Sequence, residues 1–286
     1  MKLITDAAAN LSPERAAELG VEVVPFQVTF MGKTYKDGVD IHPENLYQMY
    51  IDHPDEYVTT SQPSVGDLLK TYEKYPGEEI LSVHLSSGLS GAYSSAEHAA
   101  RMMEDQRVTV VDSHMVGPAL GWMVETAAHG IRLNWSLERI IEAMRTVQKS
   151  TLTMVTFSDM KYLIHSGRVS HLKSIVASIL KIKPIIGMNE EDGRYSNIGQ
   201  DLTFGRAIHK LVERVHKRFD NEKLRIQLMH GSNLPGVDIL RKTVNEMLNG
   251  KEDLLVPVTL VLGAHAGPTV IGLAAAPQAV FDQLYG

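Results

Sequence analysis

The sequence contains no cysteine among its 286 residues. This absence excludes disulfides, thiolate zinc sites, iron–sulfur clusters and cysteine nucleophiles. Basic residues are in the minority, because 28 Lys and Arg against 34 Asp and Glu give a formal net charge of −6. No dense basic run is present, so we expect no nucleic-acid partner.

Long hydrophobic runs and a secretion signal are also missing. Residues Met1–Asp6 contain no apolar h-region, and the longest apolar stretch, around Leu254–Ala264, is interrupted and too short to span a bilayer. Hydrophobic residues still make up 44% of the chain, which is ample for a core. We therefore expect a globular, cytoplasmic protein.

The common catalytic and cofactor motifs are absent as well. The sequence has no phosphate-binding Gly-Lys-Ser/Thr loop, no G-x-G-x-x-G fingerprint and no H-E-x-x-H motif, and its 12 histidines are scattered without metal-ligand spacing. Gly88–Ala92 departs from the G-x-S-x-G nucleophile elbow at its last residue. We expect no metal ion, no cofactor and no catalytic residue.

What is present alternates between strand and helix. Strand-like runs at Lys2–Asp6, Glu79–Leu85 and Arg107–Asp112 are each followed by helical segments, a pattern typical of a parallel sheet with helices on both faces. Gln27–Tyr35 predicts two strands joined by a tight turn. We place a boundary near Ser150, between an N-terminal α/β domain (residues 1–150) and a C-terminal α/β domain (residues 151–286), whose last strands can pack back near the first domain.

In the second half the pattern predicts helices over His171–Leu180, Thr203–Phe219 and Val237–Leu248. The predicted strands are Thr151–Phe157, Pro184–Met188, Arg225–His230, Val256–Leu262 and Val270–Ala275. The segment Leu262–Thr269 is then a turn between two strands.

Two hydroxyl-rich loops are candidate anion sites. Thr59–Ser64 precedes a predicted helix, and Leu85–Gly91 joins a buried strand to a helix, where open α/β sheets present ligand sites. Glycines and free backbone N–H groups at a helix start favour an anion. The plainer alternatives are a helix cap for the first loop and a tight turn for the second.

Two further segments carry a single charged or titratable residue. Arg168 follows Gly167 and can present its guanidinium to a carboxylate, a phosphate or a protein partner, or it can simply be solvated. His265 lies in the glycine-flanked turn Leu262–Thr269, where it can serve a ligand or make a structural hydrogen bond.

Taken in order, these segments resemble the DegV family along nearly the whole chain. The resemblance rests on Thr5-Asp6, Tyr35–Ile41, Thr60–Ser64, Leu85–Tyr93, Val111–Ser113, Gly167–Ser170 and Gly263–Pro268. Two positions depart from the family pattern: Ala7 stands where a serine is usual, and Thr269 where a glycine is usual.

The resemblance implies a two-domain DegV-like fold, with a parallel-sheet N-terminal domain, a second α/β domain and a fatty acid held between or within them. Carried over to this chain, the fatty-acid carboxylate meets Thr60, Ser61, Ser90, the Gly91 N–H and His265. By the same analogy, Arg168 serves a partner or a phosphorylated head group. The apolar stretches Met115–Met123 and Ile175–Met188 can supply a wall for the acyl chain or simply the core.

The resemblance also implies a lipid carrier with no catalysis of its own. It presents one long-chain fatty acid to the ATP-binding subunit of a fatty acid kinase, for acyl-phosphate formation and phospholipid synthesis. Such a carrier is compatible with transient contact at a membrane surface.

Two other functions stay open. A serine hydrolase or acyltransferase would use Ser90 or Ser61 with His265, and Asp112 as a third group, and it needs the serine within hydrogen-bond reach of the histidine. A regulatory module that senses a small anion would have a pocket too short for an acyl chain.

Overall fold

The computed structural model describes residues 1–104, 107–172 and 182–286, and its strands form three sheets. The first sheet is parallel and runs in the order β2 (Val21–Val24), β1 (Lys2–Asp6), β6 (Ile80–His84) and β7 (Val108–Asp112). The small sheet is antiparallel, in the order β4 (Lys33–Lys36), β3 (Gln27–Phe30) and β5 (Thr59–Ser61). The large sheet runs β10 (Tyr195–Asp201), β9 (Lys183–Met188), β8 (Leu152–Thr156), β13 (Ile271–Pro277), β11 (Leu224–His230) and β12 (Gly250–Pro257).

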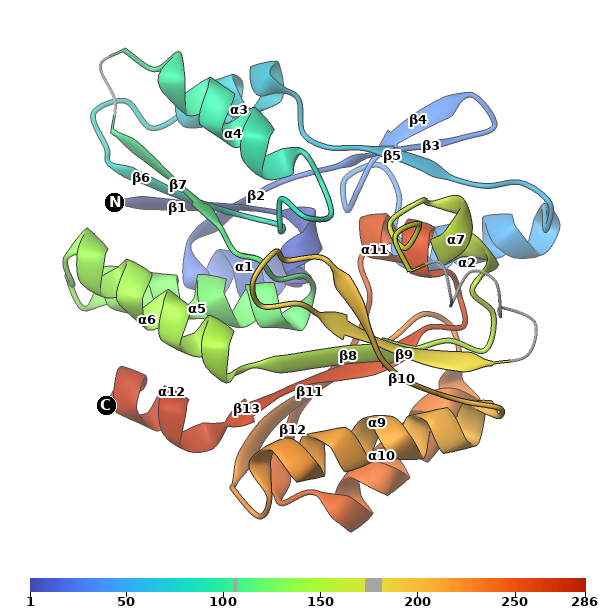
Figure 1. Cartoon of the computed structure of the whole chain (residues 1–286). Helices are drawn as coiled ribbons and strands as arrows, with labels where there is room; N and C mark the ends of the chain where they lie inside the picture. Colours follow the sequence, from blue (N-terminus) through green and yellow to red (C-terminus); the bar gives the residue numbers. More distant parts are fainter. Residues whose placement is uncertain (105–106, 173–181) are drawn as a thin grey trace.

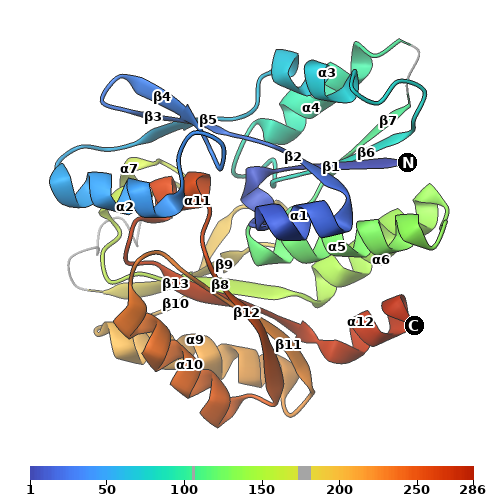
Figure 2. The same cartoon turned by 180° about the vertical axis from the view of Figure 1, so that it is seen from behind.

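Helices separate and cover the two larger sheets (Figures 1 and 2). One face of the first sheet carries α3 (Val65–Tyr72) and α4 (Ala92–Arg101). Between the first and large sheets lie α1 (Pro13–Leu19), α5 (Pro118–Arg132) and α6 (Leu137–Ser150), and the outer face of the large sheet carries α9 (Phe204–Phe219) and α10 (Leu234–Met247). The remaining helices are η1 (Ala7–Ala9), α2 (Pro43–Asp52), α7 (Lys161–His165), α11 (Leu260–Ala266) and α12 (Gln278–Tyr285).

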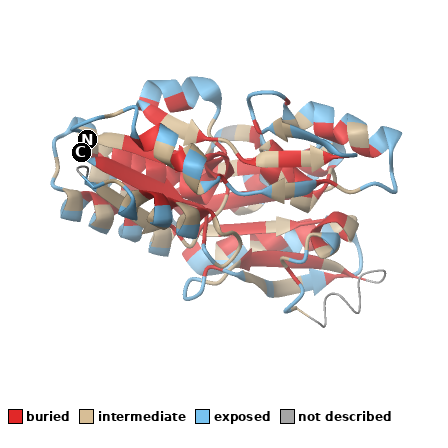
Figure 3. Cartoon of the chain, turned by 90° about the horizontal axis from the view of Figure 1, so that it is seen from above, coloured by how far each residue is buried: buried red, intermediate tan, exposed pale blue. Residues whose placement is uncertain are grey.

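The residue pattern explains these elements. All five residues of β6 are buried, as expected for a parallel strand covered on both faces. In α9 the buried residues recur at helical spacing, and the hydroxyl of Thr203 caps the helix by accepting the Arg206 N–H. Figure 3 shows the same division, with buried residues concentrated in the strands and exposed ones on the outer helix faces.

Most predicted elements are confirmed. The first sheet is parallel with helices on both faces, and β3 and β4 form the predicted hairpin. The large sheet differs, because only its β11–β12 pair is parallel. The patterns gave no sign of β10, α7 or α12.

Two adjoining predictions were wrong. The run Val256–Leu262 was expected to be a strand and Leu262–Thr269 a turn, but β12 ends at Pro257 and residues Leu260–Ala266, His265 among them, form helix α11. The β-branched residues of this run favour a strand locally, and tertiary contacts override that preference. The helix predicted over His171–Leu180 falls largely on residues 173–181, outside the described residues.

The domain boundary near Ser150 stays a prediction. The first and small sheets use residues 2–112, and the large sheet uses residues 152–277. However, α11 packs on α2, β3 and β5, and Ala274, Ala276 and Phe281 belong to the core between the sheets. Any division of the chain must therefore place its C-terminal part in contact with the N-terminal part.

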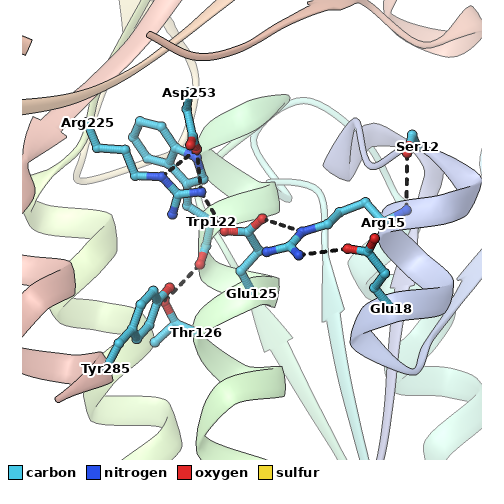
Figure 4. A network of polar contacts seen from close by, with 9 residues as sticks. All are labelled: Ser12, Arg15, Glu18, Trp122, Glu125, Thr126, Arg225, Asp253 and Tyr285. Atoms are coloured by element: carbon cyan, nitrogen blue, oxygen red, sulfur yellow. Dashed lines mark hydrogen bonds and ion pairs between the residues drawn. The ribbon is translucent and has the colours of Figure 1, made fainter. Parts of the chain in front are cut away.

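A buried ion network also joins the two parts (Figure 4). The carboxylate of Glu125 on α5 accepts hydrogen bonds from Arg15 of α1 and Arg225 of β11, at 2.9 and 2.7 Å. The Arg225 guanidinium also pairs with Asp253 and lies 4.9 Å from the centre of the Trp122 ring. Three elements distant in sequence are thus tied through one carboxylate.

Candidate functional site

The main candidate site is a mostly apolar cavity where the three sheets meet. Its free space is about 920 Å³, part of it open to solvent. Apolar side chains come from the large sheet, from α11 and from the loops that follow β2, β6 and β7, and they include Phe26, Leu85, Leu89, Val116, Met154, Phe157, Ile186, Met188, Met229, Val261 and Leu262. A few polar groups share this lining: Thr60, Gln62, Ser90, Thr153, Arg168, Tyr195 and His265. This composition is typical of a site for an apolar ligand with a small polar group.

The centre of the polar cluster is the pair Thr60 and His265. Thr60 Oγ1 lies 2.7 Å from His265 Nε2, and the other ring nitrogen, Nδ1, is buried without a hydrogen-bond partner in the described part of the chain. Burial, together with the nearby Arg168, lowers the pKa of His265 to about 3, so the ring is neutral near pH 7. The hydroxyl and the neutral ring hold two polar protons and share one hydrogen bond. One donor is therefore left unused: the Thr60 hydroxyl in the Nε2–H tautomer, and the His265 Nδ1–H in the other.

The loop after β6 is held in place by a hydrogen bond to Asp112. Asp112 Oδ1, at the end of β7, accepts the N–H groups of Ser87 and His114, each at 3.1 Å. Ser90 Oγ accepts the Ala92 N–H at 3.2 Å, so the Ser90 hydroxyl proton remains available to the cavity that it lines. The first turn of α4 follows directly, with no side-chain cap at Gly91. A hydroxyl donor beside the start of a ten-residue helix favours an anion at this place.

Arg168 contributes a positive charge to the lining. Its Nη1 donates to the Ser166 carbonyl at 2.6 Å, and it forms no ion pair with any described Asp or Glu. Its charge is felt by two neighbours in the lining, since it helps to lower the pKa of His265 and opposes the rise in the pKa of Tyr195, which burial brings to about 12. A guanidinium without a carboxylate beside an apolar cavity favours an anionic ligand.

The predicted site residues are only partly brought together. Thr60, Ser90, Arg168 and His265 all line the cavity. Ser61 is exposed and outside the lining, because alternate side chains of a strand point to opposite faces. Gly91 lies behind Gln62, where an added Cβ would come within 2.8 Å of the Gln62 amide nitrogen.

Sequence reasoning missed three polar lining residues, Gln62, Thr153 and Tyr195. Gln62 could have been found from its spacing, since it is two residues after Thr60 at the end of β5 and so faces the same side. Tyr195 follows a turn that the patterns did not predict to join two strands, so its position carried no local signal.

The two departures from the family pattern have structural roles. Ala7 is buried in η1, which Asp6 caps by accepting the Ala8 N–H. Thr269 Oγ1 accepts the Asp159 N–H at 3.0 Å and donates to the Asp159 carbonyl at 3.1 Å. Neither residue lines the cavity.

The geometry needed for a serine hydrolase is not formed by the candidate residues. His265 Nε2 contacts Thr60, and neither Ser90 nor Ser61 is hydrogen-bonded to the ring. A Ser–His–Asp chain does occur at Ser82, His84 and Asp6, but all three residues are completely buried in the first sheet. A nucleophile there cannot meet a substrate.

Known proteins match this chain over most of its length. The model of the DegV family, described as an uncharacterised protein family, matches residues 1–278. The chain belongs to the DegV family. A DegV domain-containing protein of Staphylococcus aureus strain N315 is 32% identical over 276 residues, which cover 95% of this chain and 96% of that protein.

Solved DegV structures share the fold. A DegV family protein from Thermus thermophilus, described for its fatty acid binding, has a TM-score of 0.88 and 27% identity, covering 96% of this chain and 99% of that one. DegV from Bacillus subtilis, described as a fatty acid binding protein, has a TM-score of 0.85 and 25% identity, covering 96% of this chain and 98% of that one. The mixed α/β fold is therefore the DegV fold.

The described residues contain neither a cluster suited to a metal ion nor a helix suited to span a membrane. Residues 1–104, 107–172 and 182–286 contain no group of three or more His, Asp or Glu side chains placed to hold a metal ion. Within the same ranges, no helix combines the length and the apolar character needed to cross a bilayer.

Proposed function

We propose that this chain binds one long-chain fatty acid, with the acyl chain in the apolar cavity and the carboxylate at Thr60, Ser90 and His265. The observation that carries the proposal is the polar cluster inside an otherwise apolar lining. It offers hydroxyl donors, a neutral imidazole and the charge of Arg168. These are donors for one anionic head group, and the two DegV proteins described above as fatty acid binding share the fold.

The energetics favour retention of such a ligand. About 14 buried methylenes contribute roughly 11 kcal/mol at ~0.8 kcal/mol each, before the costs of association and ordering. Burying a carboxylate without partners would cancel much of this gain. The polar cluster keeps the carboxylate hydrogen-bonded and places it near a positive charge.

The same proposal covers the role of the chain in a reaction. We propose that it acts as a carrier without catalysis of its own, and that it presents the bound acid to the ATP-binding subunit of a fatty acid kinase. Arg168 is then placed to meet the carboxylate and, after phosphoryl transfer, the acyl phosphate. Incubation with such a subunit, ATP and Mg²⁺ tests this part, since acyl phosphate must appear only when both proteins are present.

Mass spectrometry of the organic extract from the purified, denatured protein tests ligand binding. We expect a long-chain fatty acid in about one-to-one ratio with the protein and absent from a mock purification. Protein that is empty, and stays empty after incubation with palmitate and oleate, contradicts the proposal.

A pair of neighbouring hydroxyls provides the matched control. Thr60→Val removes the hydroxyl that faces the cavity, and Ser61→Ala removes the exposed one beside it. We expect Thr60→Val to weaken palmitate binding about tenfold, the equivalent of one hydrogen bond to a charged group, and Ser61→Ala to leave it unchanged. A loss in Ser61→Ala instead would return that residue to the binding site.

A further inference from the structure

Helix α11 is the element that brings His265 to the cavity. It has seven residues and comes late in the chain, yet it packs on α2, β3 and β5. Leu260 and Ala264 are buried in the core of the small sheet, together with Val28 and Tyr50. Because Thr60 lies on β5, the contact between Thr60 and His265 depends on how α11 is seated against this sheet.

The start of α11 is held by residues from far away in the sequence. The N-cap residue, Thr259, makes no capping bond, and its hydroxyl is buried without a partner in the described residues. Instead, Asp37 Oδ2 accepts the Val261 N–H at 2.8 Å, and Asn10 Oδ1 accepts the Thr259 N–H at 2.7 Å. At the other end the Tyr50 hydroxyl donates to the Ala264 carbonyl at 3.0 Å.

Asp37 holds the start of α11 at a cost in folding free energy, because its carboxylate is buried. It is 5% exposed, and no described Lys, Arg or His forms an ion pair with it. Burial raises the pKa of Asp37 to about 6, against the effect of the backbone N–H groups of Val261 and Leu260. The charged or titratable groups that face it are His42, at the start of α2, and Asp6, at the end of β1. A buried carboxylate kept at a cost to folding stability is typical of a residue with a functional role.

We propose that Asp37 is a positioning residue for the head-group end of the cavity: through α11 it fixes the ring of His265 against Thr60 and so slows ligand release. The identity of the ligand rests on the proposed function, whereas the coupling of Asp37 to His265 does not. The distance along the chain explains why no local sequence signal reveals it.

The rate of ligand release tests whether Asp37 slows the departure of the ligand. The full chain is loaded with the fluorescent fatty acid cis-parinaric acid, and its transfer to phosphatidylcholine vesicles is followed in the wild type and in Asp37→Asn. We expect release to be about tenfold faster in the variant, because a neutral hydrogen bond replaces a charge-assisted one. The thermal midpoint of unfolding should stay equal or rise. Equal release rates overturn the proposal.

Asp201→Asn is the matched control. Asp201 is 6% exposed and accepts the Leu202 N–H at 2.7 Å just before α9, but it and α9 lie outside the cavity lining. This variant loses contacts to Arg206 and Lys210, so its thermal midpoint should fall. Its release rate should match the wild type; a faster one would mean that lost stability alone speeds release, which also counts against the proposal.

Nuclear magnetic resonance of the histidine rings tests the coupling itself, without any variant of Asp37. In the ¹⁵N-histidine-labelled wild type, we expect the His265 signals to move with a midpoint near pH 6, although the pKa of the ring itself is about 3. His265→Gln assigns the signals, and His42→Gln must retain the step, which excludes titration of His42 as its cause. A His265 signal that stays constant between about pH 7.5 and 5 overturns the proposal even if Asp37→Asn does not fold. If the wild type binds no fatty acid, this titration still decides the coupling, and only the proposed function fails.

Discussion

At the scale of single residues, the cavity combines a neutral histidine with a positive arginine. Arg168 stays charged at any physiological pH, and its presence helps to keep His265 neutral by lowering the pKa of the ring. His265 can therefore take part in hydrogen bonds without adding a second positive charge, whereas Arg168 supplies the positive charge. An anionic head group meets one cation, and a small number of donors is enough to orient it.

Replacing Arg168 by Gln tests whether its positive charge contributes to binding of the anionic head group. The amide keeps donors and most of the volume but removes the charge, so we expect palmitate to bind about tenfold more weakly and the pKa of His265 to rise. Arg194→Gln, on the exposed turn between β9 and β10, is the control and should bind normally. Titration by fluorescence quenching gives both affinities; unchanged binding in Arg168→Gln would remove this residue from the head-group site.

The pH dependence of the folding stability gives a second prediction at the scale of single residues. The pKa of Asp37 is raised in the folded protein, so the folded state binds a proton more tightly than the unfolded state does. This group therefore stabilises the fold most below about pH 4, and that contribution is lost as the pH rises through about 6. At pH 7 the ionised carboxylate costs about 3 kcal/mol relative to a neutral group of the same shape, taking ~1.4 kcal/mol for each of about two pKa units.

We accordingly expect Asp37→Asn to raise the free energy of unfolding at about pH 7.5 and to have little effect at about pH 4. Urea unfolding at both pH values measures the difference between variant and wild type. The comparison must be made at each pH, because the lowered pKa of His265 acts in the opposite direction and destabilises the fold below about pH 6.5. A variant equally destabilised at both pH values would show that the carboxylate is needed for folding rather than costly to it.

At the scale of elements, the sequence predicted well wherever local pattern decides. Three strands of the first sheet (β1, β6 and β7), the β3–β4 hairpin and helix α9 follow from the residue pattern. Helix α11 does not, because its first N–H groups are satisfied by Asp37 and Asn10 rather than by Thr259. The same limit applies to the site: local pattern indicated only the two hydroxyl-rich loops as candidate anion sites, whereas the resemblance to the DegV family implied that Thr60, Ser90 and His265 meet one carboxylate. The contact between Thr60 and His265 is seen only in the fold.

One hydrogen bond between elements links two loops near the cavity. Ser86 Oγ donates to the Gly193 carbonyl at 2.7 Å, which joins the loop after β6 to the turn between β9 and β10. Glycine is required on both sides, since a Cβ at Gly88 would lie 2.5 Å from the Asp192 carbonyl oxygen and one at Gly193 would overlap Ser86 Oγ. Leu89, three residues after Ser86, and Met188, five residues before Gly193, line the cavity.

We expect Ser86→Ala to loosen this contact and speed ligand exchange several-fold, because it leaves the Gly193 carbonyl without its donor. Hydrogen exchange of residues 189–194 should rise in parallel. Ser196→Ala is the control: it removes a weaker bond, 3.4 Å to the Gly187 carbonyl, within the β9–β10 hairpin itself. If both variants exchange ligand at the wild-type rate, the contact does not limit access to the cavity.

At the scale of the whole molecule, the cavity exists because the two larger sheets are held at a fixed separation by shared helices. Helix α5 packs on β1 of the first sheet and on β8 and β13 of the large sheet. Its residue Glu125 is the acceptor shared by Arg15 and Arg225, so the polar contact and the apolar packing act on the same helix. Arg225 also lies over the rings of Trp122 and Phe281, which packs the end of the chain against α5.

Glu125→Gln should therefore destabilise the whole fold rather than one part. Arg225 is buried, with 12% of its side chain exposed, and loss of the charged acceptor leaves the more exposed Asp253 as its remaining carboxylate partner among the described residues. Removing one partner of a buried ion pair costs about 3 kcal/mol or more, so we expect a fall of that size in the free energy of unfolding. Glu79→Gln, which breaks the exposed pair with Arg107, should cost less than about 1 kcal/mol.

The unfolding transition of Glu125→Gln should stay single and cooperative by both tryptophan fluorescence and circular dichroism. Two separate transitions would mean that the parts of the chain fold independently and that the network serves only to align them.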